Sequence, residues 1–314
     1  MCGDRNPTAR AVLALVLGAL IAWACARAPQ AAAFPAEVPN MPGANDFGCR
    51  TTADKPYPVI LAHGAATDAG RSFAVLAPRL HRLGYCVFAA DVGRLPLSNL
   101  GANGVPDPKW AGLGPVAAAV EGNGIYGVAD IATQATELSA FVARVLDVTG
   151  AAKVVMVGHS TGGTDIREFV RHRPEQVASV VTVGTPYRGS TFAGLPAMFP
   201  FYGALGMDGP AIAAQVFGPA GAEQAPGTPT LNRLNADGET RPGIRYTAIA
   251  SRDDTVVTPP ETALLSDPRG GNRNIWLQDG CPALVVAHDA MLSDQRALAA
   301  IIAAVAGTPP PPPC

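Results

Sequence analysis

The stretch from Val154 to Ile166, VVMVGHSTGGTDI, constrains the fold of this chain more than any other. An apolar run of strand length, Lys153 to Gly158, comes before Ser160, and a helical pattern follows from Thr161 to His172. Glycines on both sides of the serine allow the chain to reverse within about two residues, where a Cβ would clash with the neighbouring strand and helix. We therefore expect a strand, a tight turn that carries the serine, and a helix.

The same alternation of strand and helix patterns recurs along the chain. Helical patterns cover Ser72 to Leu83 and Asp130 to Thr149, and a glycine closes each. Strands that are apolar on both faces and separated by helices form a parallel sheet covered on both sides, so the expected fold class is α/β. The further expected strands are Tyr57 to Ala62, Tyr85 to Val92, Val177 to Val183, Arg245 to Ala250 and Asn274 to Leu277.

Length and composition fit one large α/β domain. The chain has 314 residues, of which 48% are hydrophobic and 15% charged, and its net charge of -2 gives no basic patch for nucleic acid. Two long stretches rich in Gly, Ala and Pro, residues 94–127 and 185–243, interrupt the alternation. Long stretches of this kind in a compact domain often have a function, commonly as a lid or as a wall of a binding site. The second contains an aromatic run, residues 198–207, which is either ordinary packing or a substrate contact.

The N-terminus has the pattern of a secretory signal. Two arginines precede an apolar run, Ala11 to Ala24, and small residues follow up to Ala33. The run is about fourteen residues long, short of the roughly 20 that a permanent membrane anchor needs. We expect cleavage after Ala33, a secreted, extracellular protein, and one domain over residues 34–314. A lipoprotein site at Cys25 is the weaker alternative, because Trp23 stands where small residues are usual.

Export changes how the cysteines are interpreted. Cys49, Cys86, Cys281 and Cys314 remain after the signal, and an even number in an oxidising compartment suggests two disulfides. Of the three possible connectivities we favour Cys49–Cys86, which ties the N-terminal segment to a strand. Its companion Cys281–Cys314 would then hold the proline-rich tail. A metal site is the alternative, but no CxxC or HxxxH spacing supports it, so neither a metal nor a cofactor is expected.

Ser160 is an effective nucleophile only if a base accompanies it. Gly-His-Ser-Thr-Gly fits the G-x-S-x-G pattern, whose partners follow in the order acid, then histidine. His288 is the one histidine late enough in the chain and off the helix that follows the serine. His159, next to the serine, is expected to point away and fill a structural slot beneath the turn. The remaining histidines are excluded by order or by distance along that helix: His63, His81 and His172.

The acid and the oxyanion hole follow from position. Two carboxylates come directly after the strand Arg245 to Ala250, and we predict Asp254 as the acid, because the Val-Val-Thr-Pro behind it would pack the loop against the sheet. Asp253 is then expected to be a solvated turn residue. The oxyanion donors are expected to be the backbone N–H groups of Thr161 and of Ala65, which follows the first strand.

Several motifs in order resemble those of a known family. The chain from about Cys49 to Cys314 is similar to the secreted bacterial lipases of the class 2 (triacylglycerol lipase/esterase) family of α/β-hydrolases. The motifs are PVILAHG, LAPRLHRLGYCVFAADVG, ATELSAFVARVLDVTGAAKVVMVGHSTGG, LNRLN, RYTAIASRDDTVVTP and NIWLQDGCPALVVAHDAML. The resemblance implies an α/β-hydrolase fold and implies Ser160, Asp254 and His288 as the catalytic residues. It also implies Ala65 and Thr161 as oxyanion donors, and such lipases carry cysteines at the same four positions. Thr161 departs from the pattern, where glutamine is more common.

These observations predict a secreted serine carboxylester hydrolase that cleaves acylglycerols or other fatty acyl esters. An acyltransferase or thioesterase acting on cell-envelope lipids with the same triad is the alternative. A binding protein without catalysis would be expected to lack a triad member, and this chain lacks none. The expected partners are a lipid or small ester substrate and a lipid interface. We expect a monomer with no nucleic-acid partner and no permanent membrane anchor.

Overall fold

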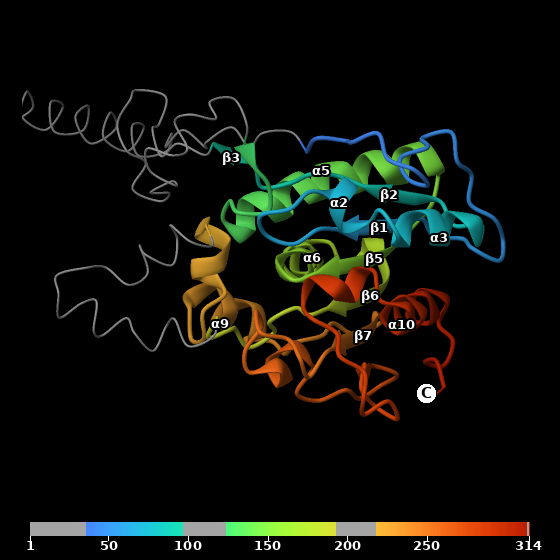
Figure 1. Cartoon of the computed structure of the whole chain (residues 1–314). Helices are drawn as coiled ribbons and strands as arrows, with labels where there is room; N and C mark the ends of the chain where they lie inside the picture. The colour runs from blue at the N-terminus through green and yellow to red at the C-terminus, as the bar shows by residue number, and fades with distance from the viewer. Residues whose placement is uncertain (1–35, 97–123, 193–217, 313) are drawn as a thin grey trace, which may run out of the picture. The chain divides into compact units, whose positions relative to one another are not determined.

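The computed structural model describes residues 36–96, 124–192, 218–312 and 314 (Figure 1). Its main feature is a six-stranded sheet in the order β2-β1-β5-β6-β7-β8, and every neighbouring pair is parallel. The expected signal, residues 1–33, and the aromatic run, residues 198–207, lie outside the described residues. The strands are β1 Val59–Ala62, β2 Val87–Ala89, β5 Val154–His159, β6 Val177–Val183, β7 Arg245–Ala250 and β8 Arg273–Trp276.

The strand order places a switch point between β1 and β5. From β1 the chain crosses outward to β2, and it later returns to the other side of β1 as β5. In open parallel sheets, the carboxyl ends of two such strands leave a crevice in which ligands bind. The loop after β1 and the turn after β5 therefore meet at this crevice.

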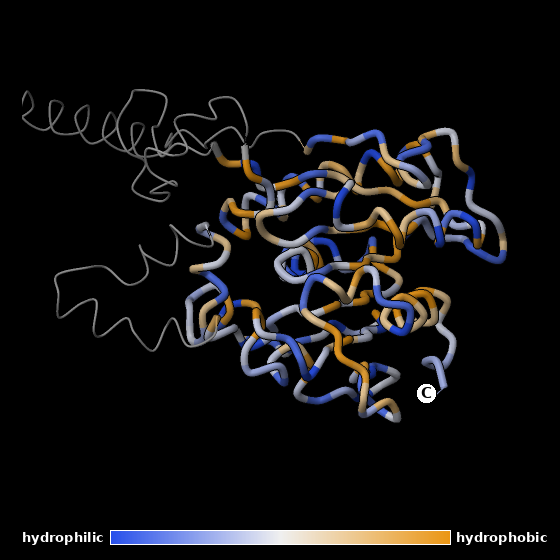
Figure 2. The backbone as a smooth tube through the Cα atoms, viewed as in Figure 1, coloured by the Kyte–Doolittle hydropathy of each residue, from blue (hydrophilic) through white to orange (hydrophobic). Residues whose placement is uncertain are grey.

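Helices cover both faces of the sheet. Alternate residues of β5 point to opposite faces, so Val154 and Met156 join one core cluster while Val155 and Val157 join the other. Helix α10 lies beside β6 and β7 (Figure 1). In the same view, hydrophobic residues are frequent along α10 and along the strands of the sheet (Figure 2). The helices α5 Ile131–Thr149 and α6 Thr161–His172 contribute to the first cluster, and α2 Ala69–Ser72, α3 Leu76–Arg82 and α10 Gln295–Ala306 contribute to the second.

The helix expected from Ser72 to Leu83 begins later in the structure, as α3 at Leu76, and the short helix α2 ends at Ser72, where the expected helix would begin. Phe73 is the C-cap of α2, so the helical backbone is interrupted before α3. Pro78 explains the break, because it has no N–H to donate to the carbonyl four residues earlier and is favoured in the first turn of a helix. Short elements complete the described part of the chain: residues 218–223 are helical, and the others are β3 Leu95–Pro96 paired antiparallel with β4 Gly124–Ile125, α9 Pro229–Asn235, and the 3-10 helices η1 Pro174–Gln176, η3 Pro260–Ala263 and η4 Asp289–Leu292.

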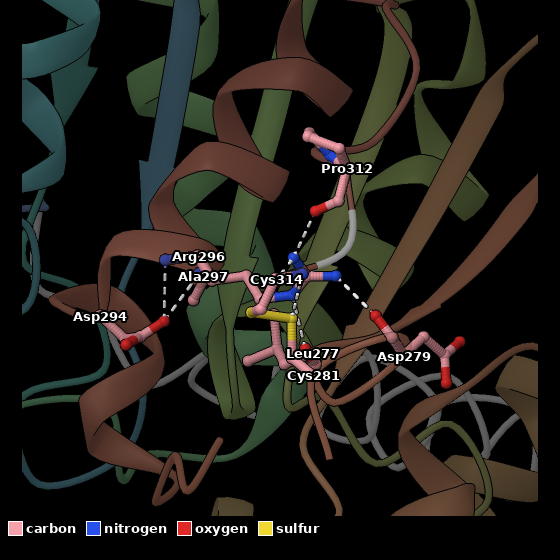
Figure 3. Close-up of a disulfide and its surroundings, with 8 residues drawn as sticks. All are labelled: Leu277, Asp279, Cys281, Asp294, Arg296, Ala297, Pro312 and Cys314. Carbon is pink, nitrogen blue, oxygen red and sulfur yellow. Dashed lines mark hydrogen bonds between the residues drawn. A yellow bond between two sulfur atoms is a disulfide. The ribbon is translucent and has the colours of Figure 1, made fainter. Parts of the chain in front are cut away.

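Both favoured disulfides are present. Cys49–Cys86, with Cα atoms 5.8 Å apart, ties the N-terminal segment to the start of β2. Cys281–Cys314, with Cα atoms 5.1 Å apart, holds the end of the proline-rich tail (Figure 3). No helix in the described part of the chain is long and apolar enough to cross a membrane.

Arg296 reinforces the second disulfide. Its Nε donates to the Leu277 carbonyl at 2.7 Å, and its two terminal nitrogens donate to the carbonyls of Pro312 and Asp279, each at 2.7 Å (Figure 3). One guanidinium thus joins α10, the segment after β8 and the tail. Asp294 begins α10 by accepting hydrogen bonds from the first-turn N–H groups of Arg296 and Ala297.

Candidate active site

Ser160 lies on a sharp turn between β5 and α6. Its backbone adopts φ 54° and ψ -126°, a strained conformation for a residue with a Cβ. The flanking glycines make the turn possible, since a Cβ on Gly158 would lie 2.6 Å from the Cα of Gly163. The Ser160 N–H donates to the carbonyl of Val183 in β6 at 2.9 Å and anchors the turn. The structure thus places Ser160 at the carboxyl edge of the sheet, at the switch point.

Asp254 and His288 form a buried pair. Asp254 follows β7, is 4% exposed, and its Oδ2 lies 2.7 Å from His288 Nδ1. Its Oδ1 accepts hydrogen bonds from the N–H groups of Val256 and Val257, both at 2.8 Å, so the loop fixes the carboxylate. A carboxylate only accepts, so the network assigns the proton to Nδ1, which leaves Nε2 of the imidazole as an acceptor.

One pocket of about 470 Å³ brings the predicted residues together. Ser160 and His288 both line it, and Asp254 lies behind His288. Ala65 and Thr161 line it as well, together with Val75, Val256, Val257 and Leu292 as its larger aliphatic side chains. All five site residues predicted from the sequence therefore lie in or directly behind one cavity.

Two backbone N–H groups at this pocket are free to donate. Among the described residues, neither the Ala65 N–H nor the Thr161 N–H has a hydrogen-bond acceptor. Thr161 is also the first residue of α6, where the helix dipole favours negative charge. Gly64 lets the Ala65 loop come close, since a Cβ there would lie 3.0 Å from the Cβ of Ser160. The pair has the arrangement of an oxyanion hole.

His63, excluded as a base by its position, orients one of these donors. The Val92 N–H donates to His63 Nε2 at 3.1 Å, so Nδ1 carries the proton and donates to the Gly64 carbonyl at 2.8 Å. In a trans peptide the carbonyl and the following N–H point in opposite directions. His63 therefore fixes the direction of the Ala65 N–H. Its burial lowers the pKa of this imidazole, against the raising effects of the Gly64 hydrogen bond and of Asp91, and keeps it neutral.

His159 does not point away from the site, and that expectation was wrong. Its Nε2 lies 3.0 Å from the carbonyl oxygen of His288, and the two ring centroids are 4.7 Å apart. Burial, with the neighbouring His288, lowers the pKa of His159 to about 3, so the ring is neutral and Nε2–H donates to that carbonyl. The residue before the nucleophile thus packs against the candidate base.

Asp253 is not a solvated turn residue either. Its Oδ2 accepts from the Gln278 side chain at 2.8 Å and from the Val286 N–H at 3.1 Å. Ser251 adds a hydrogen bond from its hydroxyl to the Val286 carbonyl at 2.6 Å. The two neighbouring carboxylates therefore make different contacts: Asp254 binds the His288 imidazole, and Asp253 binds the segment that leads to His288.

Gln224 is a pocket residue that sequence reasoning missed. It lies in the second long insertion, is 2% exposed, and its Nε2 donates to the Thr161 hydroxyl oxygen at 2.9 Å. A glutamine inside an insertion belongs to no motif, so no local signal points to it. In the described part of the chain no cluster of three His, Cys, Asp or Glu side chains could hold a metal ion.

Comparisons with known proteins agree with this architecture. Residues 57–215 match a family model described as the alpha/beta hydrolase fold. A triacylglycerol lipase from Burkholderia plantarii is 32% identical over 189 residues, which are 59% of this chain and 44% of the relative. A triacylglycerol lipase from Pseudarthrobacter phenanthrenivorans is 53% identical over 57 residues, 18% of each chain. The chain thus aligns with less than half the length of these relatives.

A solved structure supports the fold alone. Aspergillus fumigatus lipase B superposes with a TM-score of 0.56 at 19% sequence identity, over 88% of this chain and 57% of that one. At that identity the likeness concerns the arrangement of the sheet and helices.

Proposed function

This chain belongs to the α/β-hydrolase family, and from that premise we propose that it is a secreted serine carboxylester hydrolase of acylglycerols or other fatty acyl esters. One observation carries the proposal: Ser160, His288 with Asp254 behind it, and two backbone N–H groups that no described residue accepts from meet at a single pocket. Ester hydrolysis by a serine needs all three of these parts. The partial relatives that are named triacylglycerol lipases support the substrate class.

Acylation uses Nε2 of His288 as the proton acceptor, because Asp254 occupies only Nδ1. Ser160 Oγ attacks the ester carbonyl carbon while His288 Nε2 takes its proton, and the carbonyl oxygen becomes an oxyanion held by the N–H groups of Ala65 and Thr161. Asp254 stabilises the imidazolium through Nδ1–H. The imidazolium then gives its proton to the leaving alcohol oxygen as the ester C–O bond breaks.

Deacylation repeats the cycle with water. His288 Nε2 takes a proton from water, whose oxygen attacks the acyl carbonyl of the ester on Ser160. The same two N–H groups hold the second oxyanion, and the proton returns to Ser160 Oγ as the carboxylic acid leaves. No cofactor is needed for either half.

The lining of the pocket supports an apolar acyl group. Val75 and Val256 are 37% and 39% exposed, and both line the pocket that contains Ser160. Aliphatic side chains that line a pocket favour contact with a hydrocarbon chain. We propose that an acyl chain enters along these valines.

Export is supported by two features of the chain. The leader pattern in residues 1–33 precedes a proposed single domain from residue 34 to 314. The disulfides Cys49–Cys86 and Cys281–Cys314 persist in oxidising compartments such as the extracellular space.

An acyl-length series tests this function. Rates would be measured on p-nitrophenyl esters from acetate to palmitate and on emulsified long-chain triacylglycerols, with Ser160→Ala as the blank. We expect wild type to hydrolyse fatty acyl esters and Ser160→Ala to lose at least about 10,000-fold in kcat. Ser139→Ala, on α5 and away from the pocket, is the matched serine control and should keep wild-type rates. Substantial activity of Ser160→Ala would remove Ser160 as nucleophile, and a rate confined to soluble short esters would exclude the fatty acyl substrate.

A further inference from the structure

The hydroxyl of Thr161 lacks the partner that helix threonines usually find. In α5, the Thr149 hydroxyl donates to the Val145 carbonyl, four residues earlier in the same helix. Thr161 is the first residue of α6, so the residue four positions earlier, Val157, belongs to strand β5. The side chain of Thr161 is 2% exposed and lines the pocket beside Ser160. Its hydrogen must therefore find an acceptor outside its own helix.

The orientation of the Gln224 amide is fixed by its surroundings. One amide atom lies 3.1 Å from the Ala220 carbonyl oxygen, which can only accept, so that atom is the donor Nε2. The other atom, Oε1, accepts from the Thr164 hydroxyl at 2.8 Å. A flipped amide would set two acceptors against each other at Ala220, so the network admits one orientation.

This orientation decides the role of the Thr161 oxygen. Gln224 Nε2 donates to it at 2.9 Å, so the oxygen is an acceptor in this contact and its own hydrogen points elsewhere. Among residues 36–96, 124–192 and 218–312, no acceptor receives that hydrogen. Thr161 lines the pocket that contains Ser160, so the direction left for this hydrogen is toward the pocket.

The geometry points to the Thr161 hydroxyl as a third donor to the oxyanion, beside the N–H groups of Thr161 and Ala65, with Gln224 as its positioning residue. The hydroxyl and the N–H of one threonine are carried on adjacent carbons, so a single oxygen can receive both hydrogens. Gln224 occupies the acceptor side of the hydroxyl and keeps its hydrogen available to the substrate. This inference rests on the proposed function.

The expected effect lies on the chemical step. Removing one donor from an oxyanion hole costs about 100- to 1,000-fold in kcat, and two backbone donors remain here, so we expect about 10- to 100-fold for the hydroxyl. The oxygen carries full negative charge only in the tetrahedral intermediate and the transition states around it. The loss should therefore appear in kcat, with KM changed by less than about 3-fold.

Substitutions at Thr161 separate the hydroxyl from the shape of the side chain. Thr161→Val keeps the shape and the N–H but removes the hydroxyl, and Thr161→Ser keeps the hydroxyl. With p-nitrophenyl butyrate we expect Thr161→Val to lose about 10- to 100-fold in kcat and Thr161→Ser to stay within about 3-fold of wild type. Thr149→Val removes a buried helix hydroxyl far from the pocket and should keep wild-type kcat. The inhibition constant of a trifluoromethyl ketone, which forms an oxyanion on Ser160, should rise in parallel with the loss in kcat.

Gln224→Glu tests the positioning role even if Thr161→Val does not fold. At pH 9 an ionised carboxylate only accepts, so the Thr161 hydroxyl would turn its hydrogen away from the substrate. We expect Gln224→Glu to lose as much kcat as Thr161→Val, and the double variant to lose no more than either alone. Thermal melting of each variant reports the folded fraction against which its kcat is normalised.

Two results would overturn the third donor. Wild-type kcat in folded Thr161→Val would exclude it, and equal losses in Thr161→Val and Thr161→Ser would assign the effect to packing. Fully additive losses in the double variant would separate Gln224 from Thr161. If wild type hydrolyses no ester, the proposed function itself fails, which is a distinct result from active wild type with an equally active Thr161→Val.

Discussion

At the scale of single residues, the two adjacent carboxylates after β7 give a sharp comparison. Asp254 accepts a hydrogen bond from His288 Nδ1–H, with Nδ1 and Oδ2 2.7 Å apart, while Asp253 accepts hydrogen bonds from Gln278 and Val286. Asp254→Asn should lower kcat by about 1,000- to 10,000-fold, because an amide neither fixes the tautomer nor stabilises the imidazolium. Asp253→Asn keeps one acceptor oxygen and should lose less than about 10-fold, with a lower melting temperature. Both rates are measured with p-nitrophenyl butyrate, and the reverse order would assign the acid to Asp253.

The order of motifs along the sequence predicted the candidate nucleophile, acid and base. Ser160 follows β5, Asp254 follows β7 and His288 comes after β8, so each comes after a strand that the apolar pattern already indicates. The roles of His63, His159 and Gln224 could not be predicted in this way. His63 acts on the Gly64–Ala65 peptide only because β2 brings the Val92 N–H to its other nitrogen. Gln224 reaches Thr161 from 63 residues away. Such contacts depend on how distant segments pack, and no local spacing encodes them.

At the scale of elements, helix α6 carries an unusual buried acid. Asp165 is fully buried, and neither carboxyl oxygen has a hydrogen-bond partner among the described residues. Burial, reinforced by the nearby Glu223, Glu137 and Asp130, raises the pKa of Asp165 well above its ordinary value. The folded protein therefore holds a proton that the unfolded chain releases once the pH exceeds about 4.

Burial of Asp165 makes the free energy of unfolding depend on pH in one direction. Because the folded-state pKa is raised, the free energy of unfolding falls as the pH rises from the unfolded pKa of about 4 through the folded value. Asp165→Asn removes the titration, so its melting temperature should exceed that of wild type at pH 8 and approach it at pH 4. Thermal melts between pH 4 and pH 8 measure the difference. Parallel curves for the two proteins would show that Asp165 does not titrate on unfolding.

Element boundaries were less predictable than element types. Periodicity predicted the six strands of the sheet and α5, α6 in order, since long apolar runs dominate their own local structure. It began the helix that contains Pro78 at Ser72, whereas α3 begins at Leu76, because the hydrophobic pattern continues back through Phe73 although the helical backbone is interrupted between Ser72 and Leu76. It also gave no sign of β3 and β4, whose two residues each form strands only by pairing with one another.

At the scale of the whole molecule, the two disulfides close loops of similar length, with sequence separations of 37 and 33. Chain entropy alone assigns each about 3–4 kcal/mol of stability. Their settings differ, because Cys86 lies in the core cluster with Phe88, whereas the Cys314 tail is also held by Arg296. Loss of Cys49–Cys86 should therefore weaken core packing, in addition to increasing the conformational entropy of the unfolded chain.

Removing each disulfide by two Cys→Ala substitutions should change the melting temperature and kcat to different extents. Cys281→Ala with Cys314→Ala should lower the melting temperature yet keep kcat within about 3-fold, because Asp253 and Ser251 hold the segment before His288 independently of the tail. Cys49→Ala with Cys86→Ala opens a loop of similar length. Both variants leave a gap at a buried cysteine, because Cys86 is 3% and Cys281 2% exposed, but only Cys86 belongs to a core cluster, so loss of Cys49–Cys86 should lower the melting temperature further. Calorimetry and ester hydrolysis on both variants measure the two effects. If loss of the tail disulfide lowers kcat as strongly as Asp254→Asn does, the position of His288 depends on the chain terminus, and the local hydrogen bonds are insufficient to hold the site.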